Sequence, residues 1–590
     1  MTIEQSLTQT EKWSPRLGLP SWSPRLTPRL FLYGLLLVMM VWPAVMLVVG
    51  SFRTLPPGFE SEWTTEAWRT TFTGAGIGDA VYNSMIISVV TTLFATAIAA
   101  ALAFLSERTD APLRRWILPG LLIAFATPPL FYALGYSFLG NKYTGWLNNL
   151  GTLLFGIDYL VDIETWSGLI VASIFKKVAI IYLFLIGPFR SLSPAHDDAS
   201  LVSGASQFKT FFSISLPSLT PAISGAVLLG LVGGLQAFDL VLILGWPQGI
   251  NVIATRILLF VTGMSGPDYA KASVLSIALV AVVGVLCWGQ ARLLGKKNYV
   301  TVVGKAGVRR RIGLQRARPL VGTAIALFLV LAVLFPIGSV LFTSFQPIPG
   351  VYENFSLRHY VNIFQLPRVT SAVALTFTMS ILVGLLAMFL AILIAQISRG
   401  LSAREFSVVR FVTYIPLAMP GAVTALAISS GVISVPGLQQ LYGSSILLLL
   451  ALIIAVIPFA IQVANAAVVQ IAPELQEAAQ VCGASPRRTF IDVTLWLLAP
   501  SFFAGWFMAA VIVSGNLEIP LLLKAPDLNL VATVVYNLNS TSDFSAASAL
   551  LVVLLAAEAA VLLTALGLWK LLGRLYLHRK QSLDELASGV

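Results

Sequence analysis

Long runs of apolar residues recur along the whole chain, and they restrict its fold more than any other feature. A helix of about 20 apolar residues crosses the ~30 Å hydrocarbon core of a bilayer. Of the 590 residues, 57% are hydrophobic and only 11% are charged, against about 25% charged in soluble proteins. The sequence therefore predicts an all-α polytopic membrane protein with about 12 transmembrane helices, near residues 30–50, 81–105, 116–139, 167–189, 219–244, 272–291, 319–343, 372–396, 408–434, 444–471, 500–523 and 546–573. The first 29 residues are polar and rich in proline, so no cleavable signal peptide is expected.

The second half of the chain repeats the first. Pro129 recurs as Pro420, and Asp239 recurs as Glu518. The spacing between matched residues falls from 291 to 279 along the chain, which predicts an insertion of about twelve residues within 140–166 of the first half. Six spans in each half give both halves the same orientation, so the repeats are expected to be parallel and to enclose one central path.

Basic residues are distributed unevenly between the two sides of the predicted membrane. Segments assigned to the inside carry 27 of the 37 Lys and Arg residues and segments assigned to the outside carry 8, a bias that places both termini in the cytoplasm. Residues 292–319 hold nine Lys or Arg and no acid, as is typical of a solvated linker lying on anionic lipid. The expected organisation is a cytoplasmic N-terminal tail, a first half, a basic cytoplasmic linker, a second half and a cytoplasmic C-terminal tail, at 1–29, 30–291, 292–318, 319–575 and 576–590. Because the charge of +11 follows this bias, it does not indicate nucleic-acid binding.

Two polar loops, each between the fourth and fifth span of its half, share a pattern. Each has an acidic residue, two small residues, three further residues and a glycine, with a constant offset of 279: Asp198, Ala199, Ser200 and Gly204 in the first loop, and Glu477, Ala478, Ala479 and Gly483 in the second. Small residues let another protein approach a short helix closely, the acid can pair with a basic partner, and glycine permits a sharp turn. One copy of so short a pattern can arise by chance. Two copies at equivalent places of a duplicated chain indicate a function.

This pattern resembles the EAA loop of ABC-importer permeases, E-A-A-x3-G-x9-I-x-L-P. Ile214, Leu216 and Pro217 extend the match in the first loop, whereas Val493 and Trp496 depart from it in the second, as do Asp198 and Ser200 in the first. From about residue 30 to 575 the chain resembles the fused two-half permeases of binding-protein-dependent ABC importers, most closely the ferric-iron transporter permeases.

The resemblance implies a type I importer fold in a bacterial inner (cytoplasmic) membrane. It also implies two copies of an ATPase subunit on the two loops and a substrate-binding protein outside. The eight residues of the two patterns would then lie on the helices that couple the ATPase to transport. Transport would proceed by alternating access.

No catalytic set is present in the sequence. There is no GxxxxGK[ST] phosphate loop, so ATP and magnesium are expected only in partner subunits, and the chain itself is expected not to be an enzyme and to need no cofactor. The three histidines are too scattered for a metal site, and the two cysteines do not indicate a disulfide framework: His196, His359 and His578, and Cys287 and Cys482.

Four charged residues are predicted to border the translocation path. Asp239 and Glu518 come late in the fifth and eleventh predicted spans, which places them near the outer mouth, one from each half, unless they are simply interfacial carboxylates. Lys176 and Lys177 fall about ten residues into the fourth span and have no counterpart in the second half. Adjacent helical residues point about 100° apart, so one lysine, preferably Lys177, is expected to face the path and to favour an anionic or anion-chelated substrate. A role at a helix end or in packing is the alternative.

Outside the path, the sequence offers two further sets of residues. Trp63 with Trp68 and Phe355 with Tyr360 follow the first span of each half, as in an interfacial aromatic belt or, alternatively, a docking surface for an outside partner. Glu558 is a lone acid in the last span and is expected to contact a neighbouring helix.

The substrate does not follow from the residues. The resemblance favours Fe(III) or an iron chelate, while similar fused permeases serve thiamine, phosphonates and other small organic solutes. A 12-span secondary transporter would explain the hydropathy but not the matched loops. A membrane-embedded enzyme would need a convergent set of reactive groups, which the sequence lacks.

Overall fold

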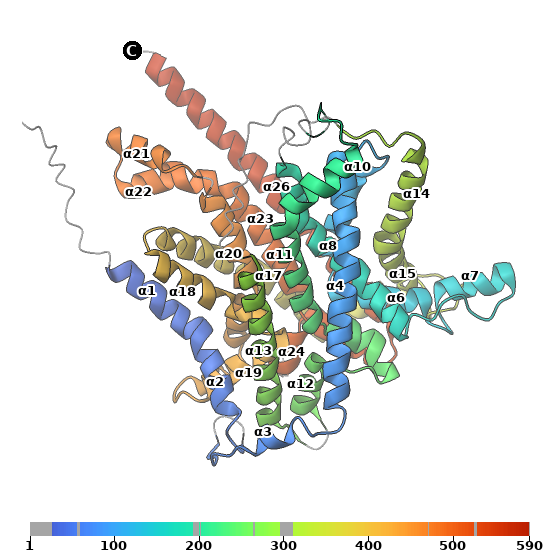
Figure 1. The fold of residues 1–590 in the computed structure, drawn as a ribbon. Coiled ribbons are helices and arrows are strands. Elements are labelled where there is room, and N and C mark those ends of the chain that lie inside the picture. Colours follow the sequence, from blue (N-terminus) through green and yellow to red (C-terminus); the bar gives the residue numbers. More distant parts are fainter. Residues whose placement is uncertain are drawn as a thin grey trace, which may run out of the picture.

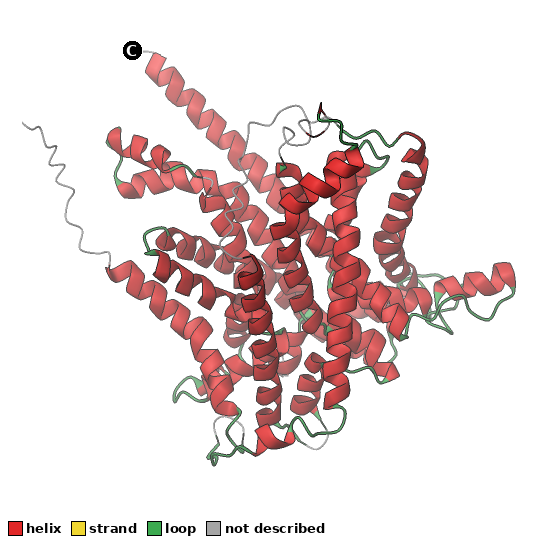
Figure 2. Cartoon of the chain, in the orientation of Figure 1, coloured by secondary structure: helices red, strands yellow, loops and turns green. Residues whose placement is uncertain are grey.

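The fold is that of a computed structural model, which describes residues 26–55, 59–192, 200, 202–263, 266–294, 311–469, 471–523 and 528–588. Helices carry nearly all of this part of the chain (Figure 2), and strand pairing within it is confined to two isolated bridges. Ten straight helices are long and apolar enough to span a membrane, and three helix pairs are bent by 80–110° at a short break. The predicted all-α polytopic membrane fold is confirmed.

The helices of the first half are α1 (Leu26–Leu36), α2 (Trp42–Gly50), α3 (Glu66–Thr70), α4 (Ile77–Arg108), α5 (Arg114–Ala126), α6 (Pro129–Gly140), α7 (Trp146–Phe155), α8 (Trp166–Ser191), α10 (Gln207–Thr210), α11 (Leu216–Leu235), α12 (Ile253–Thr262) and α13 (Tyr269–Leu294). Those of the second half are α14 (Arg318–Leu329), α15 (Phe335–Thr343), α16 (Arg358–Gln365), α17 (Pro367–Ser398), α18 (Ala403–Tyr414), α19 (Gly421–Ile433), α20 (Ser445–Val469), α21 (Pro473–Val481), α22 (Pro486–Thr489), α23 (Leu495–Ser514), α24 (Glu518–Leu523), α25 (Val531–Ser540) and α26 (Phe544–Ser588).

The duplication extends to local irregularities of the helices. π-helical turns at Leu37–Val41 and Val330–Leu334 interrupt the first span of each half, and further π turns at Phe211–Ser215 and Phe490–Thr494 precede α11 and α23. α4 and α17 have the same length of 32 residues. The insertion expected within 140–166 contains α7, which projects sideways from the bundle (Figure 1).

The helices differ from the predicted spans at four of the twelve. The third and ninth predicted spans are broken, at angles of 101° between α5 and α6 and of 110° between α18 and α19. The fifth and eleventh predicted spans run earlier, over Phe211–Leu235 and Ile491–Ser514. Hydropathy does not detect these helix ends, because the segments that follow them, the π turn Val241–Gly245 and α24, are apolar as well.

The first span of each half packs against the other half. α2 lies against α19, and α15 lies against α6. In the second of these contacts, the Tyr132 and Tyr136 hydroxyls donate to the carbonyls of Ala332 (2.6 Å) and Leu331 (2.8 Å), which belong to a π turn. A π turn departs from the regular α ladder, so its carbonyls are open to side-chain donors. The halves are therefore interlocked around their shared interior.

Gly135 of α6 is a test of this interlocking. A Cβ at Gly135 would lie 2.4 Å from the Pro336 carbonyl oxygen, and the Ser339 hydroxyl donates to the Gly135 carbonyl. We expect Gly135→Ala to force α6 and α15 apart and to destabilise the protein by about 1–3 kcal/mol, as overpacking does. Thermal melting of the purified protein measures the effect. Gly338→Ala is the matched control, because a Cβ there meets nothing within 4 Å; equal melting temperatures for the two variants would contradict the interlocking.

Candidate functional site: two matched turns and a central cavity

The first element of the candidate site is the turn that ends α21. Gly483 has a φ of +87°, which favours glycine, and the backbone N–H of Ala484 donates across the turn to the carbonyl of Ala479 (3.0 Å). A Cβ at Gly483 would meet nothing within 4 Å, so the backbone conformation, not crowding, requires the glycine. Glu477 and Ala478 are exposed on α21.

The turn at Gly204 in the first half has the same geometry. Gly204 has a φ of +85°, and Ala205 N–H donates to the Ser200 carbonyl at 3.1 Å, the counterpart of the bond between Ala484 and Ala479. The hydroxyl groups of Ser200 and Thr210 lie 2.8 Å apart and tie the turn to α10. Asp198 and Ala199 lie outside the described residues. Both turns lie at the same end of the bundle, opposite to α3 (Figure 1).

Sequence reasoning missed one pair of residues at these turns. Val202 and Val481 occupy matched positions two residues before the glycines, and 90% and 88% of their surface is exposed. An apolar side chain held out at equivalent places in two halves is typical of a contact surface for another protein. The sequence did contain a signal for this pair, because a valine recurs in both copies at the same offset of 279.

The second element is a cavity of about 390 Å³ between the two halves. Its wall includes the middle of α4, α8 and α20 and the turns that follow α11 and α23. It also includes the break between α5 and α6 and the break between α18 and α19. All four charged residues predicted for the path line it, together with polar groups that were not predicted: Lys176, Lys177, Asp239 and Glu518, with Thr91, Thr127, Ser173, Gln236 and Asn516. The four residues that the sequence grouped therefore lie at one cavity, beside the middles of three long helices.

Lys176 binds the backbone at the break between α5 and α6. Its Nζ donates to the carbonyls of Ala124 (2.8 Å), Phe125 (3.3 Å) and Thr127, which the break leaves without partners in the helix. The same Nζ lies 5.5 Å from the centre of the Tyr132 ring. The lysine therefore serves as the C-terminal cap of α5.

Lys177 is held by a different set of neutral groups. Its Nζ donates to the hydroxyls of Thr91 (2.6 Å) and Thr92 (3.2 Å) and to the carbonyl of Gly230 (3.0 Å). Both lysines line the cavity, whereas one alone was expected to face the path. Three protein acceptors already surround the ammonium group of Lys177.

The two acids lie beyond the ends of α11 and α23, not within spans as predicted. Glu518 is the first residue of α24, and its Oε2 accepts from the backbone N–H of Ala422 (2.9 Å) at the start of α19. At Asp239, by contrast, the Oδ1 atom is buried and has no hydrogen-bond partner among the described residues. The break between α18 and α19 is also bound by a residue of the first half: Gln236 Nε2 donates to the Leu417 carbonyl (2.7 Å).

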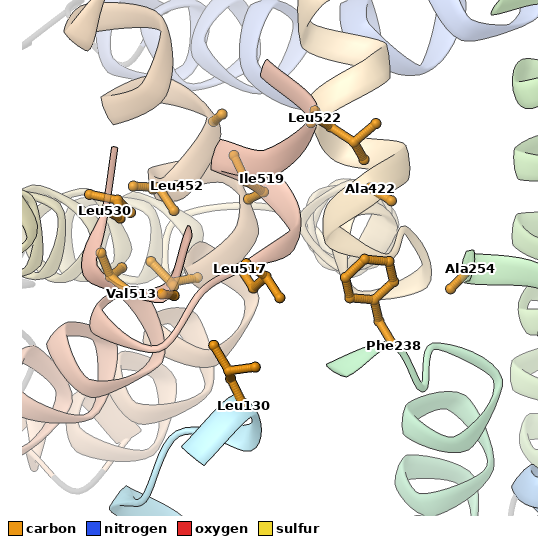
Figure 3. Close-up of a cluster of buried hydrophobic side chains, with 14 of the residues drawn as sticks. Leu130, Phe238, Ala254, Ala422, Leu452, Val513, Leu517, Ile519, Leu522 and Leu530 are labelled. Carbon is orange, nitrogen blue, oxygen red and sulfur yellow. The ribbon is translucent and has the colours of Figure 1, made fainter. Parts of the chain in front are cut away.

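Buried apolar residues adjoin the cavity next to these acids. Figure 3 shows Phe238 and Leu517, which precede Asp239 and Glu518, with Leu130 of α6 and Ala422 of α19. All four are buried. They belong to one buried hydrophobic cluster, to which both halves contribute.

Other predicted residues have structural partners. Trp68 Nε1 donates to Ser51 Oγ (3.1 Å), and the Tyr360 and Ser344 hydroxyls lie 2.7 Å apart, so each aromatic residue fixes the loop after the first span of its half. Trp63 and Phe355 are exposed. Glu558 accepts from Ser514 Oγ at 2.5 Å, in agreement with the predicted contact to a neighbouring helix.

Comparison with known proteins shows that this chain is similar to transport permeases. Residues 387–576 match the family model described as the binding-protein-dependent transport system inner membrane component. A putative ferric transport system permease protein of Haemophilus influenzae is 26% identical over 434 residues, which cover 72% of this chain and 67% of the relative. A ferric transport system permease protein of Actinobacillus pleuropneumoniae is 24% identical over 491 residues, covering 81% of this chain and 69% of the relative. A probable ABC transporter permease protein of Sinorhizobium fredii is 24% identical over 482 residues, covering 78% and 80%.

Proposed function

The chain is a permease of the binding-protein-dependent ABC importer class, and from this premise we propose that it moves Fe(III) or an iron chelate across a bacterial inner membrane. The iron assignment is supported by the two ferric transport relatives, which match most of the chain. In this proposal the cavity between the halves is the path, and an outside binding protein delivers the substrate.

The observation that carries the mechanism is the pair of matched turns. Two copies of an ATPase subunit would each grip one turn, with Val202 and Val481 as apolar contacts and Glu477 as an acidic one. When ATP draws the two subunits together, the turns would move together. Each turn is joined through a short helix and a π turn to α11 or α23, which end close to Asp239 and Glu518. The motion would therefore reach the cavity along these helices.

Transport assays test the proposal. The chain would be co-purified with the ATPase and binding protein encoded near its gene and reconstituted in liposomes. We expect uptake of radioactive iron that requires ATP and the binding protein and that excess thiamine or phosphonate does not reduce. ATP-dependent uptake of thiamine without iron would contradict the substrate, and uptake driven by an ion gradient without ATP would contradict the importer class.

The orientation of the chain is a separate prediction. The proposal places both turns, both termini and the 292–318 linker in the cytoplasm and the loop around Trp63 outside. In a chain without Cys287 and Cys482, a cysteine at position 63 should react with a membrane-impermeant thiol reagent in intact cells, and a cysteine at position 311 should react only after lysis. The reverse pattern would overturn the orientation.

A further inference from the structure

The hydrogen bonds around the cavity distinguish which charge it can accept. An ammonium group has three N–H donors. Each cavity lysine has three protein acceptors around its Nζ, namely three carbonyls for Lys176, and two hydroxyls and one carbonyl for Lys177. Gln236 likewise directs its amide donor at the Leu417 carbonyl. The ammonium donors of the wall are therefore engaged with the protein itself.

One acidic acceptor of the wall lacks a hydrogen-bond donor. Asp239 Oδ1 is buried and lacks a partner among the described residues, and within them no ion pair shorter than 4.0 Å joins either cavity lysine to an acid. A buried acceptor without a donor costs free energy, so a ligand that brings positive charge or N–H or O–H groups to Asp239 is favoured there. An anion would meet lysines whose N–H groups are already engaged and, at Asp239, a charge of its own sign.

We propose that the cavity binds its substrate as a cation, with Asp239 as the direct ligand and Glu518 beside it, and that an anionic chelate is excluded. The inference rests on the proposed iron function and deepens it, since it specifies the chemical form that enters the permease: the metal cation without an anionic chelator. Carboxylate oxygens are the ligands that hard cations prefer.

The charges of the wall also limit how tightly the cation is held. Two carboxylates and two ammonium groups line the cavity, so its formal charge is balanced. A transport path must bind weakly enough to release its substrate. The lysines, fixed to the wall by their carbonyl and hydroxyl partners, moderate the attraction of Asp239 without contacting the ligand.

Terbium(III) is a suitable probe because it is a hard trivalent cation whose luminescence is sensitised by nearby aromatic rings. Tyr132, whose ring lies 5.5 Å from Lys176 Nζ, is beside the cavity. The full-length chain purified in detergent would be titrated with terbium alone and with terbium in excess citrate, and binding of inorganic phosphate would be measured separately. We expect binding of free terbium, none of the citrate complex and none of phosphate.

Variants assign the binding to the cavity. Asp239→Asn, which keeps the shape of the side chain, should weaken terbium binding about 10–100-fold, as losses in metal coordination do. Asp268→Asn is the matched control, because Asp268 pairs with Lys271 (3.0 Å) and does not line the cavity. Unchanged binding in Asp239→Asn, preferential binding of the citrate complex, or phosphate binding that Lys177→Met abolishes would each overturn the proposal. A failure of ATP-driven iron uptake would refute the proposed function while leaving this binding result intact.

Discussion

Replacing Gly483 with leucine is expected to abolish substrate uptake while leaving the chain folded and bound to its ATPase. Gly483 has a φ of +87°, and a left-handed conformation costs about 1–2 kcal/mol for a residue with a Cβ. The turn would relax to another conformation, and the bond between Ala484 N–H and the Ala479 carbonyl would be lost. ATP hydrolysis should continue in the reconstituted complex without transport, because α21 no longer sits in register with α23.

Gly156→Leu provides the control for this substitution. Gly156 has a φ of +67° and, like Gly483, a Cβ there meets nothing within 4 Å, but it follows α7 in the insertion and not a matched turn. Its replacement should bring a similar backbone strain and leave uptake unchanged. If Gly483→Leu transports at the normal rate, or if both variants lose transport alike, the turn at Gly483 does not couple the ATPase to the path.

Replacing Lys176 with methionine is expected to have the larger effect of the two lysine substitutions, on stability and on transport together. The change leaves the carbonyls of Ala124, Phe125 and Thr127 without their shared donor, and each buried unpaired group costs about 1–3 kcal/mol. The break between α5 and α6 would lose its fixed geometry. Thermal melting of the purified protein and uptake in liposomes measure the two consequences.

Lys177→Met is the matched comparison, since it removes the same charge from the adjacent position. Thr91 Oγ1 also donates to the Ile87 carbonyl of its own helix, so the Thr91 hydroxyl keeps a partner when Lys177 is removed. We therefore expect a smaller fall in melting temperature than for Lys176→Met. The opposite ranking would show that the break does not depend on Lys176.

The sequence was sufficient for the spans, the duplication and the matched turns because each has a local signal. Apolar runs of 20 residues indicate spans, and the offset of 279 that joins Gly204 to Gly483 also joins the π turns before α11 and α23. The pattern places a glycine at both turns, and glycine is the residue that adopts a positive φ most readily. Local signals of this kind survive folding because they do not depend on distant partners.

The cavity could be predicted only in part, because its geometry depends on contacts between distant segments. Hydropathy grouped Lys176, Lys177, Asp239 and Glu518 as costly charges inside a membrane, and the structure brings all four to one cavity. It could not reveal that Lys176 caps a broken helix 49–52 residues away in sequence, or that Gln236 reaches across to Leu417 in the other half. The helix breaks themselves are hidden, since both arms of each bent pair are apolar.

Access to Ser173 tests most directly the claim that the cavity is a path opened alternately by ATP. Ser173 lines the cavity from α8, in a protein whose own cysteines, Cys287 and Cys482, are exposed and would be replaced. Ser173→Cys would be labelled with a membrane-impermeant thiol reagent, applied from either side of vesicles containing the assembled transporter, with and without ATP. The account predicts that the cysteine reacts from one side only and that ATP switches the reactive side. Labelling that is the same with and without ATP, from whichever side, would contradict it.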